Sequence, residues 1–285
     1  MDDEILRHAR SFGSVAEAYD RGRPSFPREA AAWLVGRDAA VVLEVGAGTG
    51  KLTQQLVALG HDVHATEPDP EMLAVLQRDL PDTRATRASA EELPVPDRSV
   101  DVVVAAQSFH WFDHERALAE FARVLRPGGH VALVWNSRDE RIPWVRRLGR
   151  LIGSQDQVAS ASAEPLVLAE QFGYVEEASF THWQQINRQS LQDLVLSRSN
   201  IATLDEHDRA ARLAEVVAFY DDFGRGYDGM QLPYVAHCYR AQLLGRTGDQ
   251  SEPGGPDRGP GSPPAEPPTD GDDGGDSDLL LIDFR

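Results

Sequence analysis

Cysteine and lysine are almost missing from this chain of 285 residues, which has only Cys238 and Lys51. One cysteine excludes an internal disulfide framework and a thiolate metal cluster. No histidines and carboxylates recur at metal-ligand spacing either, so we expect no metal. No apolar run approaches the roughly 20 residues that span a bilayer, and the acidic N-terminus lacks the apolar core of a signal peptide. We therefore expect a cytoplasmic protein with no membrane partner.

Basic residues are also few relative to acidic ones, and the formal net charge is therefore −18. The segment from Asp249 onward has ten acidic residues and two arginines, so it carries −8 of this charge and leaves −10 for the rest. Nucleic-acid backbones are bound by basic surfaces, so we expect no nucleic-acid partner. Lys51 follows a glycine-rich loop, but the spacing of a phosphate-binding P-loop is absent. Nothing in the sequence indicates the oligomeric state.

Composition and patterning divide the chain into three parts. Five alternations of strand-like and helix-like segments over residues 41–136 predict an α/β fold with a parallel sheet. The last part is rich in proline, glycine and aspartate and has almost nothing to bury, so we expect it to be disordered. The parts are a helical lead-in at 1–40, a core with helical insertions at 41–247 and an acidic tail at 248–285.

The most informative stretch is residues 41–50, where an apolar run of strand type contains Glu44 and then breaks into alternate glycines. Leu52, Leu56 and Leu59 follow at helical spacing, so the segment reads as strand, tight turn and helix. Glycines allow the sharp turn and leave room for a ligand against bare backbone. Such a ligand would lie at the carboxyl end of a strand. A plain tight turn is the alternative interpretation.

Two carboxylates indicate which ligand this is. A dinucleotide-binding loop has its third glycine one residue later. The carboxylate of Glu44 would also repel a negatively charged pyrophosphate. A ligand with an ammonium and a sulfonium group would favour that carboxylate. Glu67 ends the next strand-like run, about twenty residues after the loop, where an acidic residue can accept both ribose hydroxyls. The alternative for Glu67 is a solvated carboxylate at a strand end.

Over residues 12–240 the chain resembles the class I S-adenosylmethionine (SAM)-dependent methyltransferases of the small-molecule, type 11-like kind. The resemblance implies a Rossmann-like, seven-stranded, mostly parallel sheet with helices on both faces and an antiparallel last strand. Many relatives carry aspartate at the position of Ser89, and Glu91 or a backbone group would replace that adenine contact. The matching segments, in order, are 44–50, Glu67, 89–94, 100–112 and 125–129.

The resemblance also implies which residues bind SAM. The Arg23 guanidinium would suit the methionine carboxylate, although a surface arginine that caps a loop is an equal alternative. The backbone carbonyl of Gln107 would hold the ammonium group. The complete implied set is Tyr19, Arg23, Glu44, Gly46, Ala47, Gly48, Gly50, Glu67, Pro68, Met72, Ala90, Glu91 and Gln107.

The acceptor is expected where the fourth and fifth strands end. His110 is the only obvious titratable base there, and it is the catalytic candidate. A histidine that caps a helix or packs beside Trp111 is the alternative. Arg138 would suit a carboxylate acceptor. The tryptophans at this edge either line an acceptor pocket or pack in the core. The predicted substrate-binding residues are Trp111, Trp135, Asn136 and Arg138.

The sequence thus predicts transfer of a methyl group from SAM to a small organic acceptor. Displacement at a sulfonium has a good leaving group, so alignment can supply much of the acceleration. A nicotinamide-dependent oxidoreductase on a similar sheet is one alternative. A SAM-binding protein without transfer activity is another. The sequence names neither the acceptor molecule nor its acceptor atom.

Overall fold

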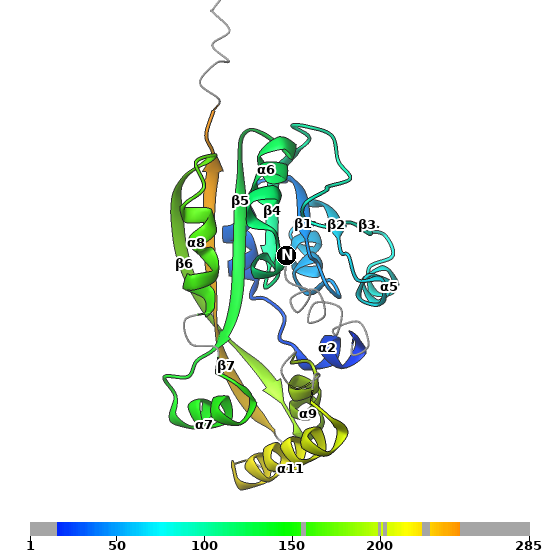
Figure 1. The fold of residues 1–285 in the computed structure, drawn as a ribbon, viewed down its shortest axis with the longest axis vertical. Coiled ribbons are helices and arrows are strands. Elements are labelled where there is room, and N and C mark those ends of the chain that lie inside the picture. Colours follow the sequence, from blue (N-terminus) through cyan, green and yellow to red (C-terminus); the bar gives the residue numbers. More distant parts are fainter. Residues whose placement is uncertain (1–15, 155–157, 199–200, 202–203, 224–228, 246–285) are drawn as a thin grey trace, which may run out of the picture. The chain divides into compact units, whose positions relative to one another are not determined.

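A seven-stranded sheet in the order β3-β2-β1-β4-β5-β7-β6 organises the structure, a computed structural model that describes residues 16–154, 158–198, 201, 204–223 and 229–245 (Figure 1). Strands β1 to β5 run parallel, and β7 lies antiparallel between β5 and β6. This confirms the predicted α/β, Rossmann-like, mostly parallel sheet with an antiparallel last strand. The strands are β1 Val41–Val45, β2 Asp62–Thr66, β3 Arg84–Thr86, β4 Val100–Ala106, β5 Leu125–Arg138, β6 Phe172–Ile186 and β7 Met230–Leu243.

The centre of the sheet is buried on both faces, as near-continuous apolar strands require. In β4, Val103 and Val104 point to opposite faces and both are fully buried. Val103 belongs to the apolar cluster that includes Phe109 and Phe121, and Val104 to the cluster that includes Leu52. The helices around the sheet are α2 Ala16–Gly22, α3 Arg28–Val35, α4 Lys51–Ala58, α5 Pro70–Asp79, the 3-10 turn η2 Phe109–Trp111, α6 His114–Val124 and α8 Val158–Val167.

Helix starts follow the signals in the sequence. Asp69 accepts hydrogen bonds from two backbone N–H groups of α5, and Pro70 is the first residue of that helix. Asp113 accepts from the N–H of Arg116 in the same way at α6. Caps of this kind satisfy donors that the first helical turn leaves unpaired. Both helices therefore begin beside strand ends, where their starts fix the loops of the candidate site.

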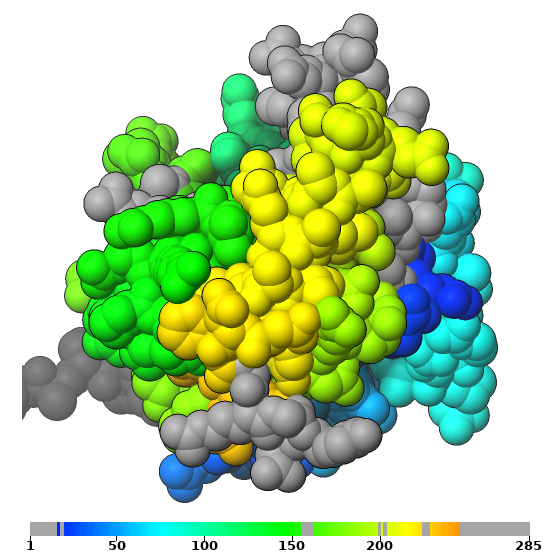
Figure 2. All heavy atoms as spheres, turned by 90° about the horizontal axis from the view of Figure 1, so that it is seen from below, coloured from blue at the N-terminus to red at the C-terminus, as the bar shows by residue number. Residues whose placement is uncertain are grey.

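A second, helical layer forms where the long strands β5, β7 and β6 continue past the parallel part of the sheet (Figures 1 and 2). Three helices pack there on the ends of β6 and β7: α7 Pro143–Ile152, α9 Arg188–Leu196 and α11 Glu206–Phe223. Their apolar cluster includes Leu148, Leu194, Phe219 and Leu232 and is separate from the two clusters of the sheet. Apolar periodicity in the sequence predicts helices around 191–196 and 210–223; the structure confirms both, and both begin earlier.

The boundaries of several elements differ from the predictions. No helix joins β3 to β4, so the expectation of five regular alternations is wrong there; only an isolated bridge between Ser89 and Glu92 forms. The sequence predicts strands at 178–186 and 232–240, and both are longer, as β6 and β7, because each continues to pair with its neighbour. The run Pro127-Gly128-Gly129 predicts the end of a helix, but α6 already ends at Val124 and residues 125–129 belong to β5.

The sequence of the lead-in predicts two helices, at 14–19 and 27–34, and the structure has α2 and α3 close to these positions. Among the described residues, no helix has both the length and the apolar character needed to cross a membrane. The tail expected at 248–285 lies outside the described residues.

Candidate active site

The loop between β1 and α4 bends through three left-handed glycines. Gly46, Gly48 and Gly50 have φ values of 67°, 58° and 87°. A side chain disfavours this region, so glycine is the residue that the turn needs. At Gly46 space is also lacking, since a Cβ atom would lie 2.6 Å from Cβ of Ser108. The loop thus presents bare backbone at the carboxyl end of β1, as the sequence predicted.

Glu67 holds this loop from the end of β2. Its carboxylate accepts hydrogen bonds from the N–H groups of Gly48 at 2.8 Å and Asp69 at 2.9 Å. The side chain is buried, and burial raises the pKa of Glu67 to about 7, although the two N–H groups act in the opposite direction. The alternative of a solvated carboxylate at this strand end is therefore wrong. Glu67 stands directly beside the glycine loop, within reach of a ligand on it.

Glu44 is the second buried carboxylate, at the end of β1. The hydroxyl of Thr53 donates to Oε2 of Glu44 at 2.6 Å, and Oε1 has no hydrogen-bond partner in the part of the chain that the structure describes. Burial raises the pKa of Glu44 to about 8, and the nearby Glu67 contributes in the same direction. An orphaned buried oxygen is costly. The carboxyl is therefore mostly protonated at neutral pH, and a ligand that brings a positive charge would lower this pKa again and give Oε1 a partner.

The end of β4 closes the opposite side of the loop. Gln107 adopts φ 54°, a left-handed conformation that costs a non-glycine residue roughly 1–3 kcal/mol. Next to it, the hydroxyl of Ser108 donates to the carbonyl of Val45 at 2.9 Å and so ties β4 to β1. Strained backbone of this kind clusters at functional sites. Gln107 therefore occupies a position suited to the ligand contact that the resemblance implies.

Several of the remaining predicted cofactor residues follow strands at the same end of the sheet, whereas Arg23 contacts Ser197 after α9. Met72 is buried, and its sulfur lies 3.7 Å from the position of a Cβ atom at Gly48. Glu91 accepts a hydrogen bond from the N–H of Asp113 at 2.9 Å, so it fastens the adjoining segment to the start of α6. Pro68 is exposed and Ala90 is buried. Ala47 donates its N–H to the carbonyl of Thr66, and the side chain of Tyr19 lies outside the described set.

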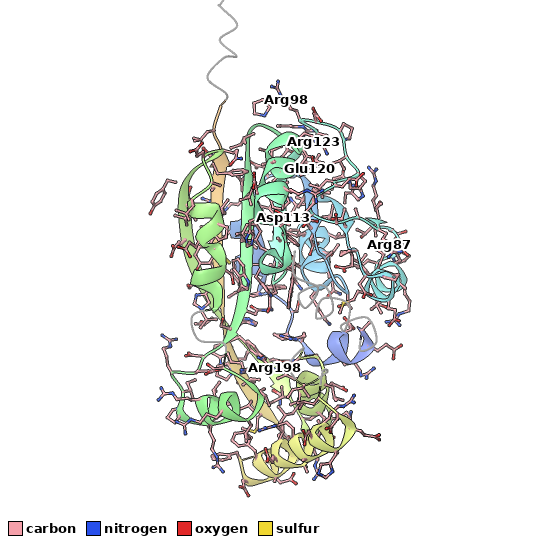
Figure 3. All side chains as sticks on the ribbon, viewed as in Figure 1. Arg87, Arg98, Asp113, Glu120, Arg123 and Arg198 are labelled. Carbon is pink, nitrogen blue, oxygen red and sulfur yellow. The ribbon has the colours of Figure 1, made fainter. Side chains whose placement is uncertain are left out.

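The segment after β3 is anchored mainly by Arg123 of α6. The guanidinium donates to the carbonyls of Leu93 and Val95 and pairs with the carboxylates of Asp97 and Glu120 (Figure 3). Glu120 in turn accepts from the N–H of Leu93 at 3.0 Å. This network fixes a connection that has no helix of its own. Ala90 and Glu91 are thereby held beside the strand ends.

His110 lies in the turn after β4, packed between two tryptophans. The indole Nε1 of Trp135 donates to Nδ1 of His110 at 3.5 Å, and the rings of His110 and Trp111 lie 4.6 Å apart. Burial lowers the pKa of His110 to about 4, and His114 and Arg23 add to the effect. The imidazole is therefore neutral at neutral pH, with its proton on Nε2. That atom can donate a hydrogen bond but not accept one.

The predicted substrate-binding residues on β5 are buried. Trp135 belongs to the core cluster and packs edge-on against Tyr239. Both polar groups of the Asn136 amide form contacts. Its Nδ2 donates to the carbonyl of Ser25, and its Oδ1 lies 3.0 Å from Nε2 of His182. Arg138 pairs with Glu140 at 3.2 Å and donates to the carbonyl of Gly153. Of these residues, Arg138 carries the charge that best suits an acidic acceptor.

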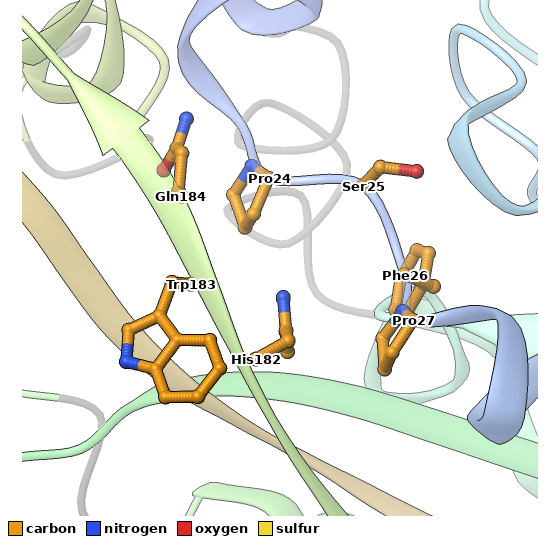
Figure 4. A pocket seen from close by; sticks show the side chains of 7 residues that line it. All are labelled: Pro24, Ser25, Phe26, Pro27, His182, Trp183 and Gln184. Carbon is orange, nitrogen blue, oxygen red and sulfur yellow. The ribbon is translucent and has the colours of Figure 1, made fainter.

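The sequence did not point to three further residues near Arg138. Tyr234 lies directly opposite Arg138 across the β5–β7 ladder, and His182 lies opposite Tyr234 on β6, with their rings stacked at 5.5 Å. Arg198 follows α9. None of these positions belongs to a motif, and only the register of distant strands brings the first two together. A pocket of about 280 Å³ adjoins His182 (Figure 4), lined by Pro24, Ser25, Phe26, Pro27, His182, Trp183 and Gln184.

Comparison with known proteins establishes the family. Residues 43–133, which span β1 to β5, match the family model described as a methyltransferase domain. An uncharacterized methyltransferase of Mycobacterium tuberculosis is 46% identical over 236 residues, which are 82% of this chain and 96% of that protein. The chain therefore belongs to the methyltransferase family.

Two further similarities extend this result. An uncharacterized methyltransferase of Schizosaccharomyces pombe is 34% identical over 218 residues, covering 73% of this chain and 86% of the relative. Among solved structures, a putative type II methyltransferase from Anaeromyxobacter dehalogenans aligns with a TM-score of 0.58 at 24% identity, over 78% of this chain and 97% of the other. The latter supports the fold.

Proposed function

We propose that this methyltransferase uses SAM as its methyl donor and a small organic molecule as its acceptor. One observation carries the proposal: in a chain of the methyltransferase family, two buried carboxylates stand at neighbouring strand ends beside a loop of left-handed glycines. Glu44 has an oxygen without a partner among the described residues, which suits a cationic ligand. Glu67 suits a ribose diol. When bound, SAM supplies a methyl group on a cationic sulfur for direct displacement.

The residues of the chain would mainly bind and align. The glycine loop lets a ligand approach the backbone closely, and Gln107 and Ser108 close the site from β4. His110 donates from Nε2 and is neutral, so we propose that it orients the acceptor and does not take its proton. Holding two reactants in line replaces a bimolecular encounter and can supply several kcal/mol of the barrier. The acceptor would enter where β4 and β5 end.

Calorimetry with SAM tests the cofactor assignment. Glu67→Ala should weaken SAM binding by about 1.5–3 kcal/mol for each charged hydrogen bond lost. Glu29→Ala, on the exposed side of α3, is the matched control and should bind SAM like the wild type. Unchanged SAM affinity in a folded Glu67→Ala protein would remove Glu67 from the site.

Radiolabel transfer separates the enzyme from a SAM-binding protein without activity. The wild type is incubated with methyl-labelled SAM and a host extract of small metabolites. We expect label in an extracted small molecule. SAM binding without any labelled product would favour the non-catalytic alternative, and NAD binding without SAM binding would favour the oxidoreductase.

A further inference from the structure

Three arginines from distant parts of the sequence gather around Tyr234. Arg23 comes from the lead-in and Arg138 from the end of β5, while Arg198, labelled in Figure 3, comes from the turn after α9. Arg138 lies directly opposite Tyr234 in the β5–β7 ladder, and Arg23 is hydrogen-bonded to Ser197, the neighbour of Arg198. Burial raises the pKa of the Tyr234 phenol, and Arg138, Arg23 and Arg198 each act in the opposite direction. These groups therefore share one interior space. Glu140, which pairs with Arg138, is the carboxylate that the described contacts place in this group beside the three arginines.

Contacts hold two of the arginines in place. Arg23 donates from Nε to the hydroxyl of Ser197 at 3.0 Å and from Nη2 to the Ser197 carbonyl at 3.2 Å. Since Ser197 precedes Arg198, this contact places Arg23 beside Arg198. Arg138 is held by Glu140 and the carbonyl of Gly153. Both are thus fixed beside Tyr234 before any ligand binds, which reduces the entropy that binding must overcome.

Arg198 and Tyr234 carry polar groups that find no hydrogen-bond partner in the part of the chain that the structure describes. Tyr234 is 3% exposed, and its buried hydroxyl has no hydrogen-bond partner among the described residues. Within the same set, the buried Nε of Arg198 has none. Burial and the other two arginines lower the pKa of Arg198 to about 9. The C-terminal end of α9 offers partial negative charge, but this does not satisfy the N–H donors. Unpaired buried donors and like charges both cost free energy.

The position of the cluster separates it from the cofactor half of the site. β5 and β7 are the second and third strands from β1 in the sheet order. At about 4.8 Å per strand, Tyr234 is displaced from the glycine loop by roughly 14 Å along the sheet. The cluster lies on the side of β4 and β5 where the acceptor is proposed to enter. His182, stacked on Tyr234, also lines the pocket of Figure 4.

We propose that Arg198 and Tyr234, with Arg23 and Arg138, bind the acidic group of the methyl acceptor, which is therefore a small organic anion. The inference rests on the proposed function, since it names the substrate class of the same site. Guanidinium forks pair two oxygens of a carboxylate or a phosphate, and the phenol donates a further hydrogen bond. The acidic chain repels anions at long range, so a local excess of arginines is what such an acceptor requires.

Thermal unfolding with simple anions tests the site without knowledge of the acceptor. Citrate, succinate and inorganic phosphate are each compared with sodium chloride at equal ionic strength. We expect at least one to raise the melting temperature of the wild type. The apparent affinity for that anion should fall roughly tenfold or more in Arg198→Gln and several-fold in Tyr234→Phe. A response to the two carboxylates alone identifies a carboxylic acid, and a response to phosphate alone identifies a phosphate ester.

The same variants distinguish a binding role from a structural one. Without anion, Arg198→Gln should melt at a higher temperature than the wild type, because it removes an uncompensated buried charge. Arg212→Gln on α11 is the control, since Arg212 pairs with Glu215 at the surface. A lower melting temperature and an unchanged anion response in Arg198→Gln would overturn the proposal, as would the absence of any specific anion effect on the wild type.

SAM affinity, measured on the same preparations, separates this inference from the proposed function. If the wild type fails to bind SAM, the proposed function is wrong. If Arg198→Gln keeps the anion response but loses SAM affinity, the cluster serves the carboxylate of the cofactor and the acceptor inference is wrong. Support requires wild-type SAM affinity in Arg198→Gln together with a lost anion response.

Discussion

Glu44 and Glu67 show at the scale of single residues how burial and chemistry are connected in this protein. Each lies at the end of a strand next to the glycine loop, and burial raises the pKa of each carboxyl. Thr53 donates to one oxygen of Glu44, and the N–H groups of Gly48 and Asp69 donate to both oxygens of Glu67. Buried carboxyls of this kind cost free energy in the folded state and cluster at functional sites, which supports the binding role proposed for them. The glycine loop lies beside both.

Gly48→Val should abolish detectable SAM binding. Its φ of 58° is strongly disfavoured for a β-branched residue, and its N–H anchors Glu67. Gly60→Val is the matched control, because Gly60 has φ 91° and open space around it, away from the loop. The control should lose roughly 1–2 kcal/mol of stability and keep its SAM affinity. Calorimetry showing wild-type affinity in folded Gly48→Val would contradict the assignment.

His110→Asn should raise KM by roughly tenfold or less and leave the shape of the pH–rate profile between pH 6 and 8 unchanged. The pKa of His110 is lowered to about 4, so no titration of this ring falls in that range. Asparagine keeps a hydrogen-bond donor at this position. The measurement needs an identified acceptor. Loss of a limb near pH 6.5 in the variant would instead assign general-base catalysis to His110.

At the scale of elements, the contact between α2 and α9 joins the lead-in to the helical layer. Arg21 donates to the carboxylate of Asp193 at 3.1 Å, and Gln184 donates to the carbonyl of Gly22 at 2.8 Å. A Cβ atom on Gly22 would overlap the backbone of Asp193 and Leu194. The two helices thus meet backbone to backbone. This contact sets the position of Arg23 beside Ser197.

Gly22→Ala should therefore lower stability by about 1–3 kcal/mol, because backbone atoms of α9 cannot move aside as a flexible side chain would. The anion response should weaken more than SAM binding, since Arg23 is displaced with α2. Gly245→Ala is the control, because nothing lies within 4 Å of a Cβ atom there. Denaturant unfolding measures the stability. Equal stability of the two variants would show that α2 does not need this close approach.

At the scale of the whole molecule, buried ionisable groups give stability a pH dependence. Glu44 and Glu67 have folded-state pKa values raised to about 8 and 7, above the unfolded value near 4.3. Their contribution to the free energy of unfolding is present below about pH 4.3 and is lost as the pH rises through 7 and 8. His64 and His110, lowered to about 4, act oppositely: their contribution is lost as pH falls below about 6.5. The pH dependence of the free energy of unfolding is therefore the sum of these two opposite effects.

Glu44→Gln isolates the carboxylate part of this balance. Relative to the wild type, the variant should gain stability between pH 5 and pH 8, on the order of 2–4 kcal/mol, because its amide does not ionise. Denaturant unfolding of both proteins at several pH values gives the difference. Glu29→Gln, exposed on α3, should show no such slope. A pH-independent difference for Glu44→Gln would contradict a raised pKa.

Removing residues 249–285 should change the melting temperature by less than about 2 °C and leave SAM affinity unaltered, because a segment of this composition buries little. The apolar residues 279–284 are the one part of that segment able to dock on the domain. Thermal unfolding of the full and the shortened chain makes the comparison. A drop of many degrees would assign such a docking role to them.

The sequence alone determined the elements whose signals are local. The glycine loop, the caps at Asp69 and Asp113 and the apolar strands β1 and β4 depend on neighbours within a few residues, so their patterns are legible in the chain. The predicted sheet and the position of Glu67 followed from these patterns together with the family resemblance. The lengths of β5, β6 and β7 were underestimated, since pairing with a distant strand extends them regardless of local pattern.

Only the tertiary structure brings together the residues of the proposed acceptor side. Arg23 and Arg138 are singled out one by one in the sequence, but nothing there connects them with each other or with Arg198 and Tyr234. They meet because the β5–β7 register places Tyr234 opposite Arg138, while the contact of α2 with α9 places Arg23 beside Arg198. Periodicity reports which face of an element is buried, but not which distant element covers it. That information exists only once the chain has packed.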